Sequence, residues 1–178
     1  MRKVGKGAYK DIETLIRNGK RIFIISPYID PYYAKFLCSM KGKRIFIISS
    51  NMSKEAKKII EGRINKSFVF LSAFALSVMF FSLYFGYSYI LIFASIIFAV
   101  SIRKAFSSNK NIEAREPKEF THAKLYMSED LAIVGSVNLT FYGTHKNIET
   151  WEIIDKKDEI EKLLKKFRKI WKESYRIS

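Results

Sequence analysis

The octapeptide GKRIFIIS stands at residues 19–26 and recurs without change at residues 42–49. Each copy has four apolar residues, mostly β-branched, between an opening glycine and a closing serine. An apolar run of this kind is typical of a strand that is buried on both faces, as in a parallel sheet. Between the copies, Pro31 begins a segment in which Tyr32, Phe36 and Met40 recur at helical spacing. Strand, helix and strand within so short a stretch predict a parallel βαβ unit and an α/β fold.

The remaining polar parts of the chain contain further segments that suit this fold class. The expected elements are a helix carrying Tyr9, Ile12, Leu15 and Ile16 that ends at Gly19, a helix carrying Ala56, Ile59 and Ile60, strands at residues 112–115, 123–127, 131–135 and 151–154, and an amphipathic helix from about residue 157. Ser128, Glu129 and Asp130 separate two of these strands, which predicts a strand hairpin with a short turn.

The composition is strongly basic. The 178 residues include 32 Lys and Arg against 17 Asp and Glu, a formal charge of +15. Such a charge predicts attraction to polyanions, and both nucleic acid and anionic lipid headgroups qualify. Cys38 is the only cysteine, so no internal disulfide is expected, and its apolar neighbours predict a small core residue. No apolar run follows the first residues, so no cleaved signal peptide is expected.

Residues 67–102 contain no charged residue and no proline. A single membrane span needs about 20 apolar residues, so this 36-residue run is too long for one comfortable crossing. It divides near Gly86, which predicts two helices at roughly residues 68–85 and 89–102. At 1.5 Å per residue, each helix is about 20–27 Å long, which is short for a bilayer. We therefore expect a transmembrane helical hairpin.

Positive residues on both sides of the apolar run support this hairpin. They are Lys57, Lys58, Arg63 and Lys66 before it, and Arg103, Lys104 and Lys110 after it. Positive flanks at both ends predict two crossings of the cell membrane, with the polar parts of the chain before and after the run on the cytoplasmic side. The expected division is residues 1–66 and 103–178 as two parts of one domain, interrupted by residues 67–102. A buried hairpin in a soluble core and a single tilted span are the alternatives.

A cluster of polar residues with the chemistry of a phosphate site surrounds the predicted strand hairpin. His122 and Lys124 are two residues apart, so on a strand they would project to the same face. Ser136 and Asn138 have the same spacing after the second strand. The hairpin can thus bring a nucleophile or acid, a point charge and neutral hydrogen-bond donors to one phosphoryl group. Gly135 allows a close approach of the backbone.

These residues resemble a known signature. HAKLY at residues 122–126 and GSVNLT at residues 135–140 look like the H-x-K…G-S-x-N motif of the phospholipase D superfamily. ISPYI at residues 25–29 is similar to the first strand of that family and its exit, and Asn147, Ile148 and Glu149 are similar to the stretch after the signature. The resemblance implies an α/β/α sandwich with a mixed central sheet, into which the apolar hairpin is inserted.

The sequence departs from the family pattern at one acidic position. Where the family has an aspartate five residues after the lysine, this chain has Glu129, followed by Asp130. The interval from Lys124 to Gly135 is also about one residue shorter than usual. Either acid could fill the family's acidic position, and Glu129 is the candidate at the matching residue.

The resemblance also implies a mechanism. Family members need two such motifs and this chain has one, so a homodimer is expected in which two copies of His122 meet. One would form a phosphohistidine and the other would protonate the leaving oxygen and then activate water. Lys124, Ser136 and Asn138 would hold the phosphate, and Glu149, with Glu152 as its rival, would orient the imidazole. No metal or other cofactor is expected. His145 would line the substrate groove or be an ordinary loop residue.

Two functions are therefore compatible with the sequence. The first is a membrane-anchored phosphodiesterase that cleaves nucleic acid or phospholipid, because both substrates present the same phosphodiester. The second is a catalytically inactive membrane adaptor that binds anionic polymer or lipid, for which the altered acidic position is the main support.

Overall fold

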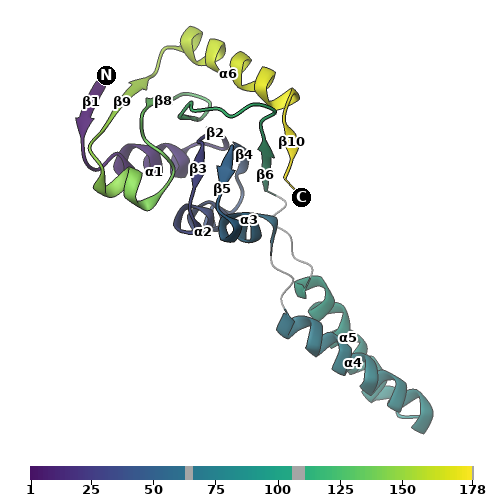
Figure 1. The fold of residues 1–178 in the computed structure, drawn as a ribbon. Helices are drawn as coiled ribbons and strands as arrows, with labels where there is room; N and C mark the ends of the chain where they lie inside the picture. The colour runs from purple at the N-terminus through teal and green to yellow at the C-terminus, as the bar shows by residue number, and fades with distance from the viewer. Residues whose placement is uncertain (63–65, 106–110, 178) are drawn as a thin grey trace. The chain divides into compact units, whose positions relative to one another are not determined.

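The computed structural model describes residues 1–62, 66–105 and 111–177 (Figure 1). The chain divides into two compact units. Unit 1 is formed by Met1–Glu61 together with Asn109–Ser178, and unit 2 by Gly62–Ser108. Arg63 and Lys110 lie outside the described residues, as do the side chains of Lys66 and Lys104.

Unit 1 is an α/β body. Its helices are α1 (Tyr9–Asn18), α2 (Pro31–Ser39), α3 (Lys54–Glu61) and α6 (Lys157–Lys172), with one turn of π-helix, η1 (Tyr142–Lys146). Its strands are β1 (Arg2–Gly5), β2 (Arg21–Ile25), β3 (Tyr28–Ile29), β4 (Arg44–Ile48), β5 (Asn51–Met52), β6 (Ile112–Glu116), β7 (Leu125–Met127), β8 (Ala132–Gly135), β9 (Glu149–Ile154) and β10 (Tyr175–Arg176).

Within the described residues, eight strands form a mixed sheet in the order β1-β9-β8-β7-β2-β4-β6-β10. The repeated octapeptide forms β2 and β4, which lie side by side and parallel, with Arg21 opposite Arg44 and Ile25 opposite Ile48. The pairing continues at the same offset in the two-stranded sheet of β3 and β5. The predicted βαβ unit is thus confirmed, because equal apolar runs give two equivalent central strands.

Helices cover both faces of the large sheet, as Figure 1 shows. On one face, α1, α2 and α3 pack against Ile22, Ile24, Ile45 and Ile47 of the central strands. On the other face, Ile160 and Phe167 of α6 pack against Ile25, Ile48, Leu125 and Met127. Because successive strand residues point to opposite faces, the four-residue runs supply both cores. The expected three-layer arrangement around a mixed sheet is confirmed.

The strands at the margins of the sheet differ from the expectation. β1 and β10 pair antiparallel to β9 and β6, and neither was predicted from the sequence. Both are short and largely exposed, so they carry little of the alternating pattern by which a strand is recognised. The hairpin strand β7 begins at Leu125, so His122 and Lys124 do not lie on it as expected.

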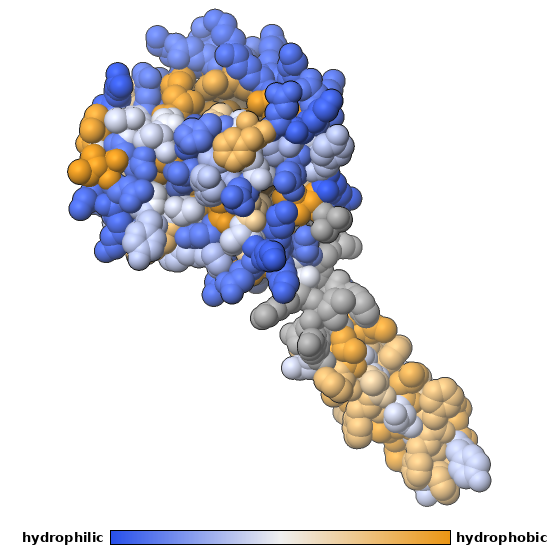
Figure 2. Space-filling view, viewed as in Figure 1, coloured by the Kyte–Doolittle hydropathy of each residue, from blue (hydrophilic) through white to orange (hydrophobic). Residues whose placement is uncertain are grey.

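Unit 2 is a helical hairpin of α4 (Lys66–Phe85) and α5 (Ser88–Ala105), joined at Gly86, whose φ is +76°. Small side chains are buried between the helices, namely Ser72, Ala75, Ser82, Ala94 and Ser101. The large apolar side chains point outward and give the hairpin a nearly continuous apolar surface (Figure 2). Among the described residues, only Ser67–Phe85 is long and apolar enough to cross a membrane, and Ser88–Arg103 is a shorter apolar helix.

Candidate active site

The signature residues meet at one edge of the large sheet. The parallel strands β2, β4 and β6 end there at Ile25, Ile48 and Glu116, and we call this the carboxyl edge. Because β7 is antiparallel to β2, with Leu125 opposite Ile25, the segment before β7 starts at the same edge. β8 ends there and β9 begins there. Ligand sites in open α/β sheets lie at this end of the strands.

His122 and Lys124 are brought together although they precede β7. The Lys124 ammonium lies 2.9 Å from Nδ1 of His122 and donates a 2.8 Å hydrogen bond to its backbone carbonyl. His122 is exposed, whereas Lys124 is 7% exposed. Burial lowers the pKa of Lys124, and the nearby Glu149 carboxylate acts in the opposite direction. The lysine is thus a largely desolvated cation beside an accessible imidazole, an arrangement that attracts an anion such as phosphate.

A serine hydroxyl holds the backbone just before His122. The Thr121 amide donates to Oγ of Ser50, at 2.9 Å, and the same hydroxyl donates to the Thr121 carbonyl. Ser50 follows β4, so this contact ties the segment before β7 to the carboxyl edge. Sequence reasoning did not identify Ser50, because an isolated serine after a strand carries no signal of a partner 71 residues away.

Ser136 and Glu149 form the second part of the cluster. The Ser136 hydroxyl donates to Oε2 of Glu149 and accepts a 3.0 Å hydrogen bond from the Thr150 amide. The side chain of Asn147 donates to Oε1 of Glu149 at 3.3 Å. Both carboxylate oxygens thus have donors, and in this single chain they are Ser136 and Asn147, not His122. The rival Glu152 is exposed and lies within β9, opposite Val134.

Asn138 lies beside these residues with one unsatisfied atom. Its Oδ1 is the buried side-chain polar atom without a hydrogen-bond partner among the residues that the structure describes. Leaving such an atom unpaired costs about 1–3 kcal/mol. A buried, unpaired amide at a site is suited to a partner from outside the chain, such as a phosphate oxygen facing the amide's nitrogen after a flip.

Gly135 is required by the close approach of β9. A Cβ atom built on Gly135 would lie 2.1 Å from the Thr150 carbonyl oxygen and 2.7 Å from Cα of Trp151. Both are backbone atoms of the neighbouring strand and cannot move aside cheaply. The glycine therefore permits the pairing that places Ser136 against Glu149 and Thr150.

We expect Gly135→Ala to destabilise unit 1 by about 3 kcal/mol or more, since β8 and β9 must separate. Urea unfolding in detergent, followed by circular dichroism, measures this. Gly42→Ala is the comparison, because Gly42 has no atom within 4 Å of its Cβ position and strain at its φ of +77° is the only cost. Equal stability of the two variants would contradict this account.

Glu129, expected to be a catalytic residue, does not lie in the cluster of His122, Lys124, Ser136 and Glu149. It lies after β7, at the opposite edge of the sheet, which we call the amino edge, where β2, β4 and β6 begin. Its carboxylate accepts hydrogen bonds from the backbone amides of Arg21, at 2.7 Å, and Lys20, at 3.2 Å. Asp130 is exposed at the same turn. The acidic position is therefore structural, and it secures the start of β2.

These contacts give Glu129 a pH-dependent effect on stability. Burial raises its pKa, but hydrogen bonds from its own amide and from Arg21 and Lys20 outweigh this, and the net pKa lies below the ordinary value. A carboxyl group with a lowered folded-state pKa stabilises the protein above its unfolded pKa, and this contribution is lost as the pH falls through the folded pKa.

We expect Glu129→Gln to lower the free energy of unfolding by about 1–2 kcal/mol at pH 7. The difference from the parent protein should shrink as the pH falls below about 4.3, the ordinary glutamate pKa. Urea unfolding curves at several pH values measure it. A difference that stays constant down to the acid limit would show that Glu129 acts without its charge.

His145 has a packing role in this structure. Its ring stacks on Tyr9 at 4.2 Å and on Phe141 at 4.6 Å between centroids. Its Nδ1 lies 2.8 Å from the Thr144 hydroxyl, which accepts a hydrogen bond from buried Tyr33. These contacts tie η1 to α1 and α2, so the interpretation as a loop residue that packs is favoured over a groove residue.

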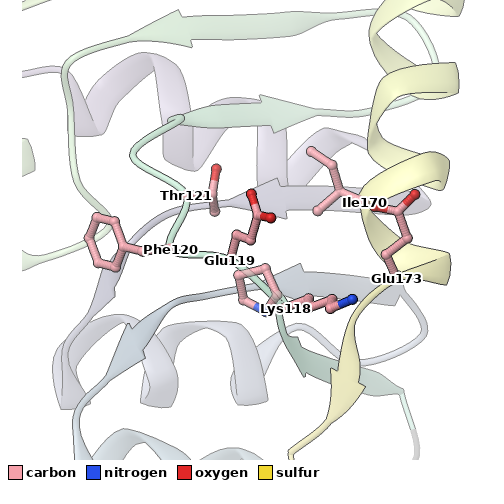
Figure 3. A pocket seen from close by; sticks show the side chains of 7 residues that line it. Lys118, Glu119, Phe120, Thr121, Ile170 and Glu173 are labelled. Carbon is pink, nitrogen blue, oxygen red and sulfur yellow. The ribbon is translucent and has the colours of Figure 1, made fainter.

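A small hollow lies beside the segment that leads to His122 (Figure 3). It measures about 260 Å³ and lies between residues 117–121 and the end of α6. Its lining residues include Lys118, Glu119, Ile170 and Glu173, so charges of both signs face it. Within the described residues, no group of three or more His, Cys, Asp and Glu is placed to hold a metal ion.

Part of the sequence matches a known family model, and the fold is similar to that of solved structures. Residues 99–171 match the family model described as "Cardiolipin synthase, PLD-like domain". The fold is similar to that of Nuc from Salmonella typhimurium, a phospholipase D family member (TM-score 0.57, 18% identity, 99% of this chain and 97% of that chain). It is also similar to NucT from Helicobacter pylori (TM-score 0.57, 12% identity, 96% and 91%).

Phosphatidylserine synthase from Haemophilus influenzae has a similar fold as well (TM-score 0.55, 14% identity), with 99% of this chain covering 39% of that chain. A search of curated proteins found no match.

Proposed function

Because residues 99–171 match a phospholipase D-like family model and the fold is similar to that of phospholipase D family members, we propose that the chain is a phospholipase D-like, membrane-anchored phosphodiesterase that works as a homodimer. The observation that carries the proposal is the assembly of His122, Lys124, Ser136 and Glu149 at the carboxyl edge. An accessible imidazole, a desolvated cation and hydroxyl and amide groups around one point suit nucleophilic attack on a phosphodiester.

The proposed reaction has two displacements at phosphorus. His122 of one chain attacks phosphorus, a nitrogen–phosphorus bond forms, and the bond to the leaving oxygen breaks. His122 of a second copy gives its proton to that oxygen, then takes a proton from water as the water displaces the imidazole. The products are an alcohol and a phosphomonoester. Lys124, Ser136 and Asn138 hold the phosphate oxygens, and Glu149, which binds Ser136 and Asn147 in the single chain, would orient the imidazole in the dimer.

Two features support the second copy. The single chain supplies one imidazole where the reaction uses a base and an acid, and the Asn138 amide oxygen is buried without a partner. On the β9 side of the cluster, Tyr142 and Ile148 are 71% and 74% exposed. Large apolar side chains exposed next to an incomplete site suit an interface with another copy.

The hairpin of unit 2 is the proposed membrane anchor. Its outward side chains are apolar on all sides, and α4 and α5 have 20 and 18 residues, about 30 and 27 Å in length. A bilayer of about 30 Å accepts two such helices with slight thinning. Their ends carry the positive residues, so both ends and unit 1 would lie on the cytoplasmic side of the cell membrane.

The inactive adaptor has lost its main support. It rested on the altered acidic position, and Glu129 performs a structural role at the amino edge, remote from His122. An acid that binds backbone amides can be Asp or Glu without any change at the site.

The proposal is tested with purified full-length protein in detergent, with a chelator present and bis(p-nitrophenyl) phosphate as substrate. We expect steady release of p-nitrophenol that is insensitive to the chelator, from a species whose light-scattering mass is that of two chains. Salt-sensitive binding of anionic polymer without turnover would support the adaptor instead. Activity in a species of one chain would exclude the shared site.

A further inference from the structure

An aromatic side chain beside the reacting histidine has no place in the core or in the proposed reaction. Phe120 is 62% exposed, and its ring centroid lies 6.3 Å from that of His122. In Figure 3 its ring extends from the loop on the side away from Lys118, Glu173 and α6. Single exposed apolar side chains are common, but this ring lies beside the reacting histidine, where it is available to a bound group that can cover it.

The position of this ring is fixed. Phe120 directly precedes Thr121, whose amide and carbonyl are both bonded to the hydroxyl of Ser50. A reacting phosphorus would sit about 3–3.5 Å from the His122 nitrogen that attacks it. A ring centred 6.3 Å from the imidazole is then within reach of the group that neighbours the phosphate.

From these observations we propose that the substrate is single-stranded nucleic acid, with an unpaired base next to the scissile phosphate stacked on Phe120. This inference rests on the proposed phosphodiesterase activity. Bases stack on exposed aromatic rings without regard to sequence, and a duplex would keep its bases paired and unavailable. The charge of +15 draws the polyanion to the protein.

The test uses the full-length protein reconstituted in vesicles of three parts phosphatidylcholine to one part cardiolipin. A single-stranded oligonucleotide is compared with an abasic strand of equal length, with its own duplex, and with cardiolipin of the vesicles. We expect the wild type to favour the base-bearing single strand over the abasic strand about tenfold or more in kcat/KM. Phe120→Ala should abolish this preference, so that its kcat/KM for the base-bearing single strand falls to that for the abasic strand.

Two variants serve as controls. Phe120→Trp keeps a flat ring and should keep the preference, and Tyr175→Ala removes an exposed ring on β10, which three strands separate from β7 in the sheet. Two results would overturn the inference without refuting the phosphodiesterase activity. One is a Phe120→Ala protein that discriminates between the strands like the wild type. The other is turnover of cardiolipin by the wild type that is faster than turnover of the oligonucleotide. Cleavage of neither substrate by the wild type would refute the activity itself.

Discussion

Replacing His122 by asparagine is expected to reduce phosphodiester turnover on the order of 10³-fold or more. The substitution removes both proposed roles at once, because in a dimer each site uses two copies of the same imidazole. His122 is exposed, and its ring has one aromatic neighbour, Phe120, so folding should be unaffected. The rate of p-nitrophenol release, measured beside the unfolding midpoint, separates lost chemistry from lost structure.

The chain's other histidine supplies the control for this variant. His145→Phe keeps a flat ring between Tyr9 and Phe141 and removes an imidazole that lies outside the cluster. We expect it to retain activity within a few-fold of the wild type. If His122→Asn turned over substrate as fast as His145→Phe, the assignment of the nucleophile would be wrong.

The second large effect concerns the hairpin. Phe74 and Ile96 lie near the middle of α4 and α5 and are 67% and 57% exposed. A lysine at the centre of a membrane helix costs about 2.5–3.5 kcal/mol on insertion scales. The double substitution Phe74→Lys with Ile96→Lys should therefore move most of the protein out of the membrane fraction that resists alkaline extraction.

The matched control is Phe74→Leu with Ile96→Leu, which keeps both positions apolar and should leave the protein in the resistant fraction. The partition of the full-length chain is measured by immunoblotting of the two fractions. A lysine variant that stayed as resistant as the leucine variant would mean that a bilayer does not surround these helices. The hairpin would then be a surface for another protein.

Much of the fold could be predicted because its signals are local. The repeated run IFII predicts two equivalent strands. In the structure these strands are parallel neighbours with identical residues opposite each other. The buried face of α6 could be predicted in the same way, because Ile160 and Phe167 recur at helical spacing and pack into the same core. Such patterns consist of apolar residues at regular spacing along the chain, and this spacing marks the face of each element that the fold buries.

The marginal elements were not predictable in this way. β1 and β10 exist because β9 and β6 offer unpaired backbone groups, and their own residues are mostly exposed. The contact between Ser50 and Thr121 joins residues 71 positions apart. Neither these strands nor this contact has a sequence pattern of its own, because each depends on a partner that only the folded sheet brings near.

The sequence by itself predicted that His122 and Lys124, near the start of one strand of a short hairpin, and Ser136 and Asn138, after the other strand, would share one edge of the sheet. Only the tertiary structure decided which acid belongs with them. The register of β7 against β2 carries Glu129 to the amino edge, where backbone amides bind it, and the pairing of β8 with β9 brings Glu149 to Ser136. Register is a property of strand pairs, and no single strand encodes it.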